Sequence, residues 1–169
     1  YALKRDHLGT IKRFKARLVA QGFSQVEGFD FHATFANTVG FDSIRVLLTY
    51  AAVHDLQLST VDVRTAYLYA PLEEEYDIYM RQPKGYEQTG PKGEQMVCKL
   101  VKALYGLRQG ARRWCITLKK GLISMGFKCC ESDQGVYVMT RDDSRIIIAA
   151  YVDDLIIADN CPEIRKEVM

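Results

Sequence analysis

The chain has 169 residues, of which 48% are hydrophobic, and a formal net charge of +2. This length suits one core or a piece of a larger enzyme, and no apolar run approaches the roughly 18 residues of a membrane span, so no membrane partner is expected. Five cysteines without a C-x-x-C pair indicate a reduced, intracellular protein without a zinc site. Because the chain starts at Tyr1 and stops at Met169 inside a predicted helix, we expect a fragment of a longer polypeptide.

Residues 11–23 alternate basic and apolar positions, which predicts a strand with one charged face. An aromatic-rich loop, residues 25–41, follows. Asp42 or Ser43 is expected to cap a helix whose apolar residues recur at three- and four-residue spacing. These apolar residues are Ile44, Leu47, Leu48, Ala51 and Ala52.

Short elements fill the middle of the chain. The pattern predicts a strand over 56–63, a helical turn over 65–69, an acidic loop over 71–77, and two strands that could form a hairpin, 78–83 and 96–101.

A second helix is predicted over 111–125, with Gly126 ending it. Its apolar side is formed by Trp114, Leu118, Leu122 and Met125. Strands at 135–140 and 145–152 then form a hairpin, 155–159 a further strand, and Asn160 with Pro162 opens a last helix. Strands and helices mix without regular alternation, which favours the α+β class.

Charge is distributed unevenly along the chain. Residues 1–17 hold six Lys and Arg against one acid, residues 97–120 hold seven and no acid, and acids gather at 62–77. Such segregation is typical of a protein that grips a polyanion around an acidic centre. The alternative is that each basic cluster is simply a solvated face.

Two pairs of aspartates stand close together in the sequence. Asp142 and Asp143 lie among polar turn formers and predict a solvated hairpin loop. Asp153 and Asp154 interrupt an apolar stretch whose flanks offer no Gly or Asn for an easy two-residue turn. Because burying an unpaired carboxylate is costly and adjacent carboxylates repel each other, we expect a positive group to meet this second pair.

Asp62 also ends an apolar strand, in the segment "LSTVDVRTAYL". A lone aspartate there is more often a turn or cap residue. Together with Asp153 and Asp154, however, it would gather three carboxylates at one edge of a sheet. Mg²⁺ prefers oxygen ligands, and two ions about 3.5–4 Å apart can clamp the oxygens of a phosphoryl transfer. The hypothesis is that these acids are metal ligands.

Six consecutive segments resemble the copia-type retrotransposon reverse transcriptase. They are "FKARLVAQGFSQVEGFDFHATFA", "SIRVLLTYAA", "VDVRTAYLYAPLEEE", "IYMRQPKGY", "VCKLVKALYGLRQGARRW" and "YVDDLIIA", and cover about residues 11–160. The resemblance implies a right-hand polymerase whose antiparallel palm sheet packs on helices, with the thumb missing. Fingers (about 1–55 and 75–110) would alternate with palm (about 56–74 and 111–169). The whole would lie in a Pol polyprotein with integrase and RNase H.

The resemblance also implies the metal-binding set. Asp62 matches the first palm aspartate, and Asp153 and Asp154 match the pair of the polymerase "Y-x-D-D" hairpin. Together with Val63 they would hold two Mg²⁺ ions, for which Mn²⁺ can substitute. Asp62 would bridge both ions and Asp154 would act from the outer shell.

The same resemblance implies the nucleotide-binding residues. Tyr67 matches the aromatic residue under the incoming sugar, where its ring would exclude a 2′-hydroxyl, although it could also be an ordinary core aromatic. Lys15 or Arg17 would neutralise the triphosphate. Trp114 is expected to be helix core. Further nucleotide contacts are expected from Tyr105, Gly106 and Arg108.

The implied reaction is attack of a primer 3′-hydroxyl on the α-phosphate of a dNTP, directed by an RNA template. The RNA–DNA hybrid would be gripped through its backbone and shape rather than its sequence. The reaction is expected in a cytoplasmic virus-like particle, with a product destined for the nucleus.

The chain departs from the family pattern at several positions. Gln109, Gly110 and Ala111 stand where the family usually reads Gln-Ser-Pro, and Cys115 where an aromatic is typical. Such drift keeps open an inactive remnant that only binds nucleic acid or serves assembly. A generic two-metal nuclease would explain the acids but neither the basic strand nor Tyr67.

Overall fold

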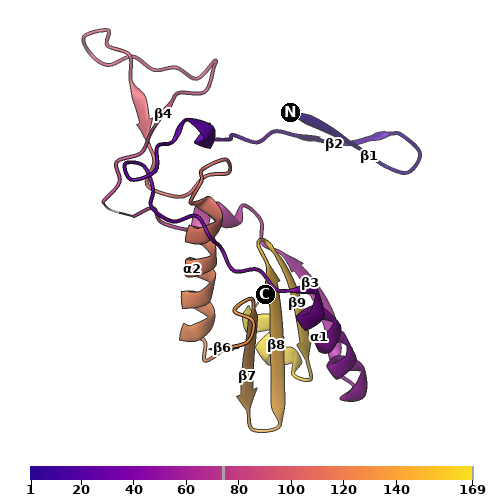
Figure 1. Ribbon diagram of the computed structural model, residues 1–169. Coiled ribbons are helices and arrows are strands. Elements are labelled where there is room, and N and C mark those ends of the chain that lie inside the picture. Colours follow the sequence, from indigo (N-terminus) through magenta and orange to yellow (C-terminus); the bar gives the residue numbers. More distant parts are fainter. Residues whose placement is uncertain (74, 169) are drawn as a thin grey trace.

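The computed structural model describes residues 1–73 and 75–168. In this part of the chain, helices and two small two-stranded sheets accompany a five-stranded antiparallel sheet (Figure 1). The order across the sheet is β3 (Gln57–Asp62), β9 (Asp154–Asp159), β8 (Ser144–Tyr151), β7 (Val136–Arg141) and β6 (Lys128–Cys129). The mixed α+β class predicted from the sequence is therefore confirmed.

The five-stranded sheet carries apolar side chains on both faces. Strand residues point alternately to the two faces, so Ile148 and Ile157 pack in one core while Ala149 and Ala158 pack in another. Coverage on both sides explains why the sequences of the central strands β8 and β9 are almost continuously apolar between their ends.

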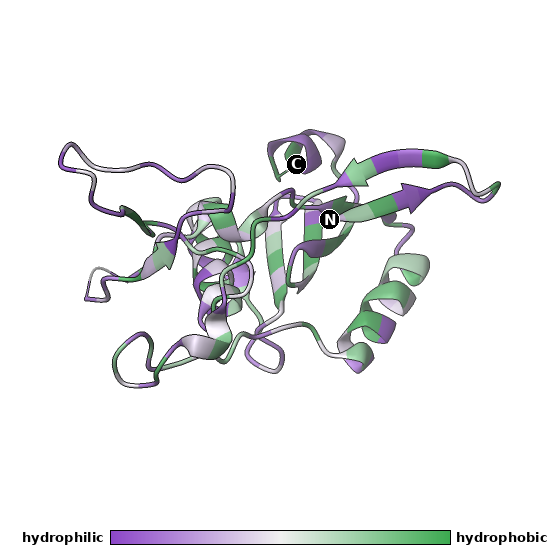
Figure 2. Ribbon diagram, turned by 90° about the horizontal axis from the view of Figure 1, so that it is seen from above, coloured by the Kyte–Doolittle hydropathy of each residue, from purple (hydrophilic) through white to green (hydrophobic). Residues whose placement is uncertain are grey.

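Helices supply the cover for each face of the sheet. Leu122 and Ile164, from α2 and α3, pack in the core on one face, and Leu47 and Ala51 of α1 pack on the other. Seen from above in Figure 2, α1 and the C-terminal helix accordingly lie on opposite sides of the sheet. The helices are α1 (Phe41–Val53), α2 (Gly110–Ser124) and α3 (Pro162–Val168).

The start of α1 differs from the prediction. The helix begins at Phe41, its N-cap is Gly40, and no side chain of the segment caps it, so the expected cap at Asp42 or Ser43 was wrong. Instead, the Gly40 amide donates to Oδ2 of Asp133 at 2.9 Å. A carboxylate from the β6–β7 connection therefore takes the place of a local cap.

The N-terminal strand is shorter than predicted and has a partner that the sequence did not reveal. Of residues 11–23, only β2 (Ile11–Lys15) is a strand, and it pairs with β1 (Ala2–Arg5). Residues Gly22–Ser24 form a short 3₁₀ turn, η1.

The second small sheet confirms the predicted hairpin between residues 78–83 and 96–101. Both small sheets lie near one end of the main sheet in Figure 1. No helix in the described ranges is long and apolar enough to cross a membrane. The paired strands are β4 (Tyr79–Arg81) and β5 (Val97–Lys99).

The two aspartate pairs lie at opposite ends of β8. Asp142 and Asp143 form the two-residue turn between β7 and β8, as predicted. Val152 and Asp153 form the turn between β8 and β9, and Asp154 is the first residue of β9. Figure 1 shows this second end of the sheet beside the start of α2.

Candidate active site

Asp62 and Asp154 lie opposite each other on two adjacent strands. Asp62 ends β3, and its Cα partner in the β3–β9 ladder is Asp154. Directly opposed residues of an antiparallel pair project to the same face of the sheet. Both are exposed, and neither carboxylate has a hydrogen bond or ion pair with the residues described. The fold therefore places two free carboxylates together at one end of the sheet.

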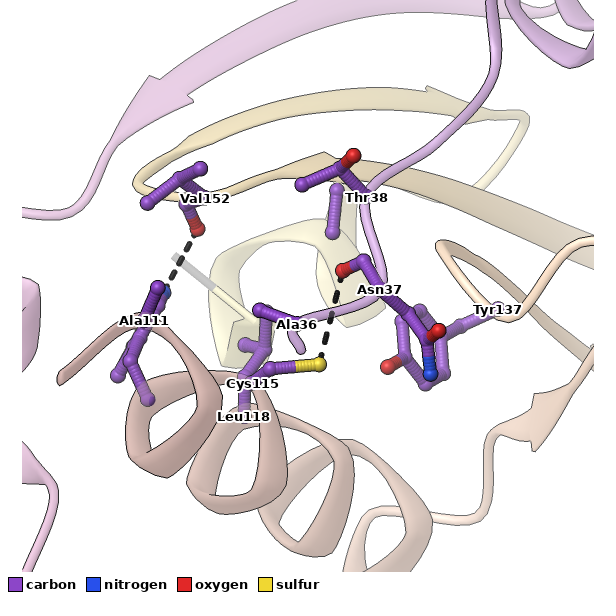
Figure 3. A pocket seen from close by; sticks show the side chains of 10 residues that line it. Ala36, Asn37, Thr38, Ala111, Cys115, Leu118, Tyr137 and Val152 are labelled. Carbon is purple, nitrogen blue, oxygen red and sulfur yellow. Dashed lines mark hydrogen bonds between the residues drawn. The ribbon is translucent and has the colours of Figure 1, made fainter. Parts of the chain in front are cut away.

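The turn before Asp154 has an unusual backbone. Val152 has φ +57°, in the left-handed region, where a β-branched residue is a true outlier. Two hydrogen bonds support it: the Val63 amide donates to the Asp153 carbonyl at 2.9 Å, and the indole Nε1–H of Trp114 donates to the Val152 carbonyl at 2.6 Å. Figure 3 shows Val152 with this second bond dashed. The turn therefore depends on neighbouring elements rather than on its own sequence.

Asp153 is approached by an aromatic pair. The Tyr105 hydroxyl donates to Asp153 Oδ2 at 3.2 Å. The Tyr105 ring is stacked on the ring of Tyr67, with centroids 4.3 Å apart and planes 24° apart. The guanidinium carbon of Arg17 lies 5.5 Å from the Tyr105 centroid. Tyr105 therefore contacts Tyr67, Arg17 and Asp153 at once, and the stack that it forms with Tyr67 lies beside Asp153.

The two tyrosines of this stack are held in their neutral form. Burial, and then the negative charge of Asp153, raise the pKa of Tyr67 above its ordinary value. Burial, the Asp153 charge and the hydrogen bond to Asp153 also raise the pKa of Tyr105. The Tyr105 hydroxyl therefore remains a donor to the carboxylate at neutral pH.

Lys15 and Arg17 are separated by the structure. Lys15 is the last residue of β2, pairs with Ala2 and makes no side-chain hydrogen bond or ion pair within the described part of the chain. Arg17 reaches the tyrosine stack. Of the two residues, Arg17 is the one whose charge lies beside the candidate site.

Gly106 and Arg108 connect the N-terminal segment to the loop before α2. Gly106 has φ +94°, and a Cβ there would lie 2.1 Å from the Ala20 carbonyl oxygen. Only glycine therefore permits this approach, which includes a 2.8 Å bond from the Ala20 amide to the Tyr105 carbonyl. The Arg108 side chain donates to the Gly22 carbonyl at 3.1 Å. Both residues join segments around the site.

Gln109 was not predicted as a site residue. It is buried, accepts a bond from Gln25 and donates to the Asp30 carbonyl, both at 3.1 Å. It thereby ties the loop after η1 to the start of α2. The only signal in the sequence was a polar residue inside the block "LYGLRQGARRW".

The donor atoms, although not their spacing in this structure, suit a hard cation such as Mg²⁺. Within residues 1–73 and 75–168, no three His, Cys, Asp or Glu side chains are grouped closely enough to hold a metal ion together. Among the residues described, each of the three aspartates nevertheless keeps at least one carboxylate oxygen free of hydrogen bonds, and none forms an ion pair with a Lys or Arg. Oxygen ligands of this kind suit Mg²⁺. The metal assignment of Asp62, Val63, Asp153 and Asp154 stays a prediction.

Comparison with known proteins gives one consistent result. The chain is 43% identical over 158 residues to the retrovirus-related Pol polyprotein from transposon TNT 1-94 of Nicotiana tabacum, an alignment that covers 93% of this chain and 12% of that protein. It is 39% identical over 155 residues to the corresponding polyprotein from transposon RE1 of Arabidopsis thaliana, covering 91% of this chain and 10% of that protein. The chain spans about a tenth of the length of these relatives. No solved structure matches it.

Residues 1–168 match the family described as reverse transcriptase (RNA-dependent DNA polymerase). This match covers nearly all of the chain, and the similar proteins are polyproteins of plant retrotransposons. The copia-type resemblance is thereby confirmed, and the chain belongs to the reverse transcriptase family.

Proposed function

We propose that this chain is the RNA-directed DNA polymerase domain of a copia-type Pol polyprotein. It adds deoxynucleotides to a primer 3′-hydroxyl on an RNA template. The observation that carries the proposal is the pairing of Asp62 with Asp154 at the sheet end where Asp153 forms the turn. In this reading the five-stranded sheet with α2 and α3 belongs to the palm, whereas α1 and the two small sheets lie in the ranges proposed for the fingers.

Divalent cations would be held by the three aspartates and the Val63 carbonyl. When bound, Mg²⁺ supplies positive charge to the triphosphate and lowers the pKa of the attacking hydroxyl. The side chains of Asp62 and Asp154 are exposed, so this end of the sheet is open to a primer terminus and a nucleotide.

The chain's own residues orient the nucleotide. Arg17 brings a permanent positive charge toward the triphosphate, because it already lies over the Tyr105 ring. The Tyr67 ring, fixed by stacking on Tyr105, would occupy the space that a ribonucleotide 2′-hydroxyl needs. Tyr105 holds the Asp153 carboxylate through its hydroxyl.

Template and primer would be bound mainly through their phosphates, because a polymerase must accept every sequence. The β1–β2 hairpin and the segment after it carry six Lys and Arg in residues 1–17, which suits that grip. The remaining partners are the other Pol domains, integrase and RNase H. The proposed location is a cytoplasmic particle.

Primer extension tests the proposal with a matched pair of variants. Asp153→Asn removes one carboxylate from the proposed site, and Asp143→Asn removes one from the turn at the opposite end of β8. On an RNA template with Mg²⁺ or Mn²⁺, Asp153→Asn should lower dNTP incorporation about a hundredfold or more. Asp143→Asn should incorporate at the wild-type rate.

Three other results would each contradict the proposed polymerase function or the proposed role of the aspartates. Template cleavage without incorporation would support a two-metal nuclease. Binding of template and primer with neither activity would support an inactive remnant. Equal losses in both variants would show that the aspartates act through stability rather than chemistry.

A further inference from the structure

Trp114 joins the interior of α2 to the turn that carries the aspartates. It is the chain's single tryptophan and only 5% exposed. Its ring packs among the buried residues around Ala66, Leu104 and Leu107. Its indole Nε1–H also donates to the Val152 carbonyl at 2.6 Å. The burial of Trp114 is explained by apolar packing alone, but its side chain also makes a specific hydrogen bond.

The accepting residue is the one with the strained backbone. Two-residue hairpin turns that need positive φ at the first central position normally use glycine there, yet this chain has Val152 at φ +57°. Such a conformation persists only where the surroundings impose it. Asp153 follows directly, so the backbone of Val152 sets its direction, and the same turn leads into β9, which begins at Asp154.

Among the described residues, the indole of Trp114 is the one recorded donor to the Val152 carbonyl, and the space beside it is small. Figure 3 shows the small cavity beside the turn, lined by Ala111, Cys115 and Leu118 of α2 and by Tyr137 of β7. Its volume is about 10 Å³, at the lower limit for one water molecule. Cys115, the next residue of α2, points to the Asn37 carbonyl at 3.6 Å instead. Trp114 is therefore the donor on which the Val152 carbonyl depends.

We propose that Trp114 is a positioning residue for the polymerase reaction. Its indole N–H fixes the Val152 carbonyl and thereby holds the Val152–Asp153 turn in the conformation that presents Asp153 and Asp154. The inference rests on the proposed function for its catalytic consequence, but its structural part can be measured independently.

Trp114→Phe removes the donor and keeps an aromatic ring in the core. Tyr137→Phe is the control, because Tyr137 lines the same cavity, is also buried and makes no hydrogen bond to the described residues of the turn. Amide hydrogen exchange gives the readout. The Val63 amide is bonded to the Asp153 carbonyl and reports opening of the turn, whereas the Ala150 amide is bonded to Gly135 and reports the sheet.

In Trp114→Phe, exchange at Val63 should accelerate about tenfold more than exchange at Ala150, because only the turn loses a hydrogen bond. In Tyr137→Phe the two amides should change by equal factors. Equal acceleration at Val63 and Ala150 in Trp114→Phe would overturn the proposal, since it would make Trp114 an ordinary core residue.

Single-turnover kinetics of dNTP incorporation test the effect of Trp114 on the reaction itself. Trp114→Phe should lower the rate of dNTP incorporation about tenfold while the apparent dNTP affinity changes less than about twofold. A loss confined to affinity would contradict the positioning role. If the wild-type chain incorporates no dNTP, the proposed function fails, and the exchange result still decides the role of Trp114.

The wild-type protein provides a test that does not depend on the variant folding. With one tryptophan, the chain has one indole N–H resonance. That proton should be protected from solvent exchange and should lose its protection together with the Val63 amide as denaturant is added. An indole proton that exchanges freely while Val63 remains protected would overturn the proposal.

Discussion

The stacked tyrosines are the most specific arrangement at the scale of single residues. Tyr67 lies in η2 (Ala66–Tyr69), the next element after the strand that ends at Asp62, and Tyr105 lies in the loop before α2. The centroids of their stacked rings are 4.3 Å apart. Because Tyr105 also bonds Asp153, the ring of Tyr67 is fixed in relation to a proposed metal ligand. This is what a steric filter for the nucleotide sugar requires.

Tyr67→Ala should therefore relax sugar discrimination. Removing the ring opens the space of a 2′-hydroxyl, and the ratio of dNTP to ribonucleotide incorporation should fall about tenfold to a hundredfold. The measurement is kcat/KM for matched dNTP and ribonucleotide substrates in an active polymerase. Tyr69→Ala is the control, since Tyr69 lies in the same short helix but is 61% exposed. Unchanged discrimination in Tyr67→Ala would remove Tyr67 from the site.

At the scale of the elements, Asp133 links the start of α1 to the segment that leads into β7. It accepts the Gly40 amide at the start of α1 and the Gly135 amide beside β7. Partial burial alone would raise the pKa of Asp133, but hydrogen bonds from Ser43, Gly40 and Gly135 outweigh it and hold that pKa below its ordinary value of 3.8. The ionised carboxylate therefore stabilises the contact between α1 and the sheet.

This contact predicts a pH-dependent stability difference. A depressed folded-state pKa means that the stabilisation is fully present above about pH 4 and is lost as the pH falls through the folded pKa. Asp133→Asn should lower the free energy of unfolding at pH 7 by about 1–2 kcal/mol, and the difference should shrink at an acidic pH well below 4. Urea denaturation at both pH values measures it.

Asp42→Asn is the matched control for the same helix. Asp42 is 94% exposed and paired only with Arg45, so its loss should change the free energy of unfolding by less than about 0.5 kcal/mol at either pH. A pH-independent effect of Asp133→Asn, or an equal effect of Asp42→Asn, would contradict the bridging role of Asp133.

At the scale of the whole molecule, a pair of glycines lets the N-terminal segment approach the site. A Cβ on Gly22 would lie 1.9 Å from the Gly106 carbonyl oxygen, and one on Gly106 would lie 2.1 Å from the Ala20 carbonyl oxygen. Backbone packs directly on backbone here. Arg17 follows the β1–β2 hairpin and lies three residues before Ala20, whose backbone contacts Gly106. This backbone contact keeps Arg17 near the Tyr105 ring.

Gly106→Ala should detach this segment. Trypsin should then cleave within residues 12–17 about tenfold faster, because local opening controls cleavage there. Gly93→Ala is the control: Gly93 has a similar φ of +80°, but a Cβ there meets nothing within 4 Å. It shares the backbone strain without the clash. Equal cleavage rates in the two variants would show that the glycine contact does not hold the segment.

Much of this arrangement could be predicted from residue patterns, and what could not be predicted depends on long-range contacts. Alternating apolar residues located β3, and apolar runs separated by polar turns located β7, β8 and β9, so Asp62, Asp153 and Asp154 were foreseen at strand ends. Their family roles followed from the six matching segments. Which residue of β9 faces Asp62 depends on register, and register is a property of the paired strands.

Other features left little trace in the sequence. The cap of α1 comes from Asp133, 93 residues away, while nearer candidates such as Asp42 stood in the expected place. Trp114 lay on an apolar helix stripe and was expected to be core only, because its acceptor is a backbone carbonyl on another element. The strand β1 is short and half charged, so its pairing with β2 gave no periodic signal.

The most direct measurement is an Mn²⁺ titration of the ¹⁵N-labelled chain, following the broadening of amide resonances by the paramagnetic ion. Asp62, Asp153 and Asp154 should broaden together at the lowest Mn²⁺ concentrations, before Asp142 and Asp143, and Asp62→Asn should weaken the effect at Asp153 and Asp154 about tenfold. Broadening at the Asp142–Asp143 turn first, or at residues 153 and 154 without residue 62, would mean that the three carboxylates do not share a metal site.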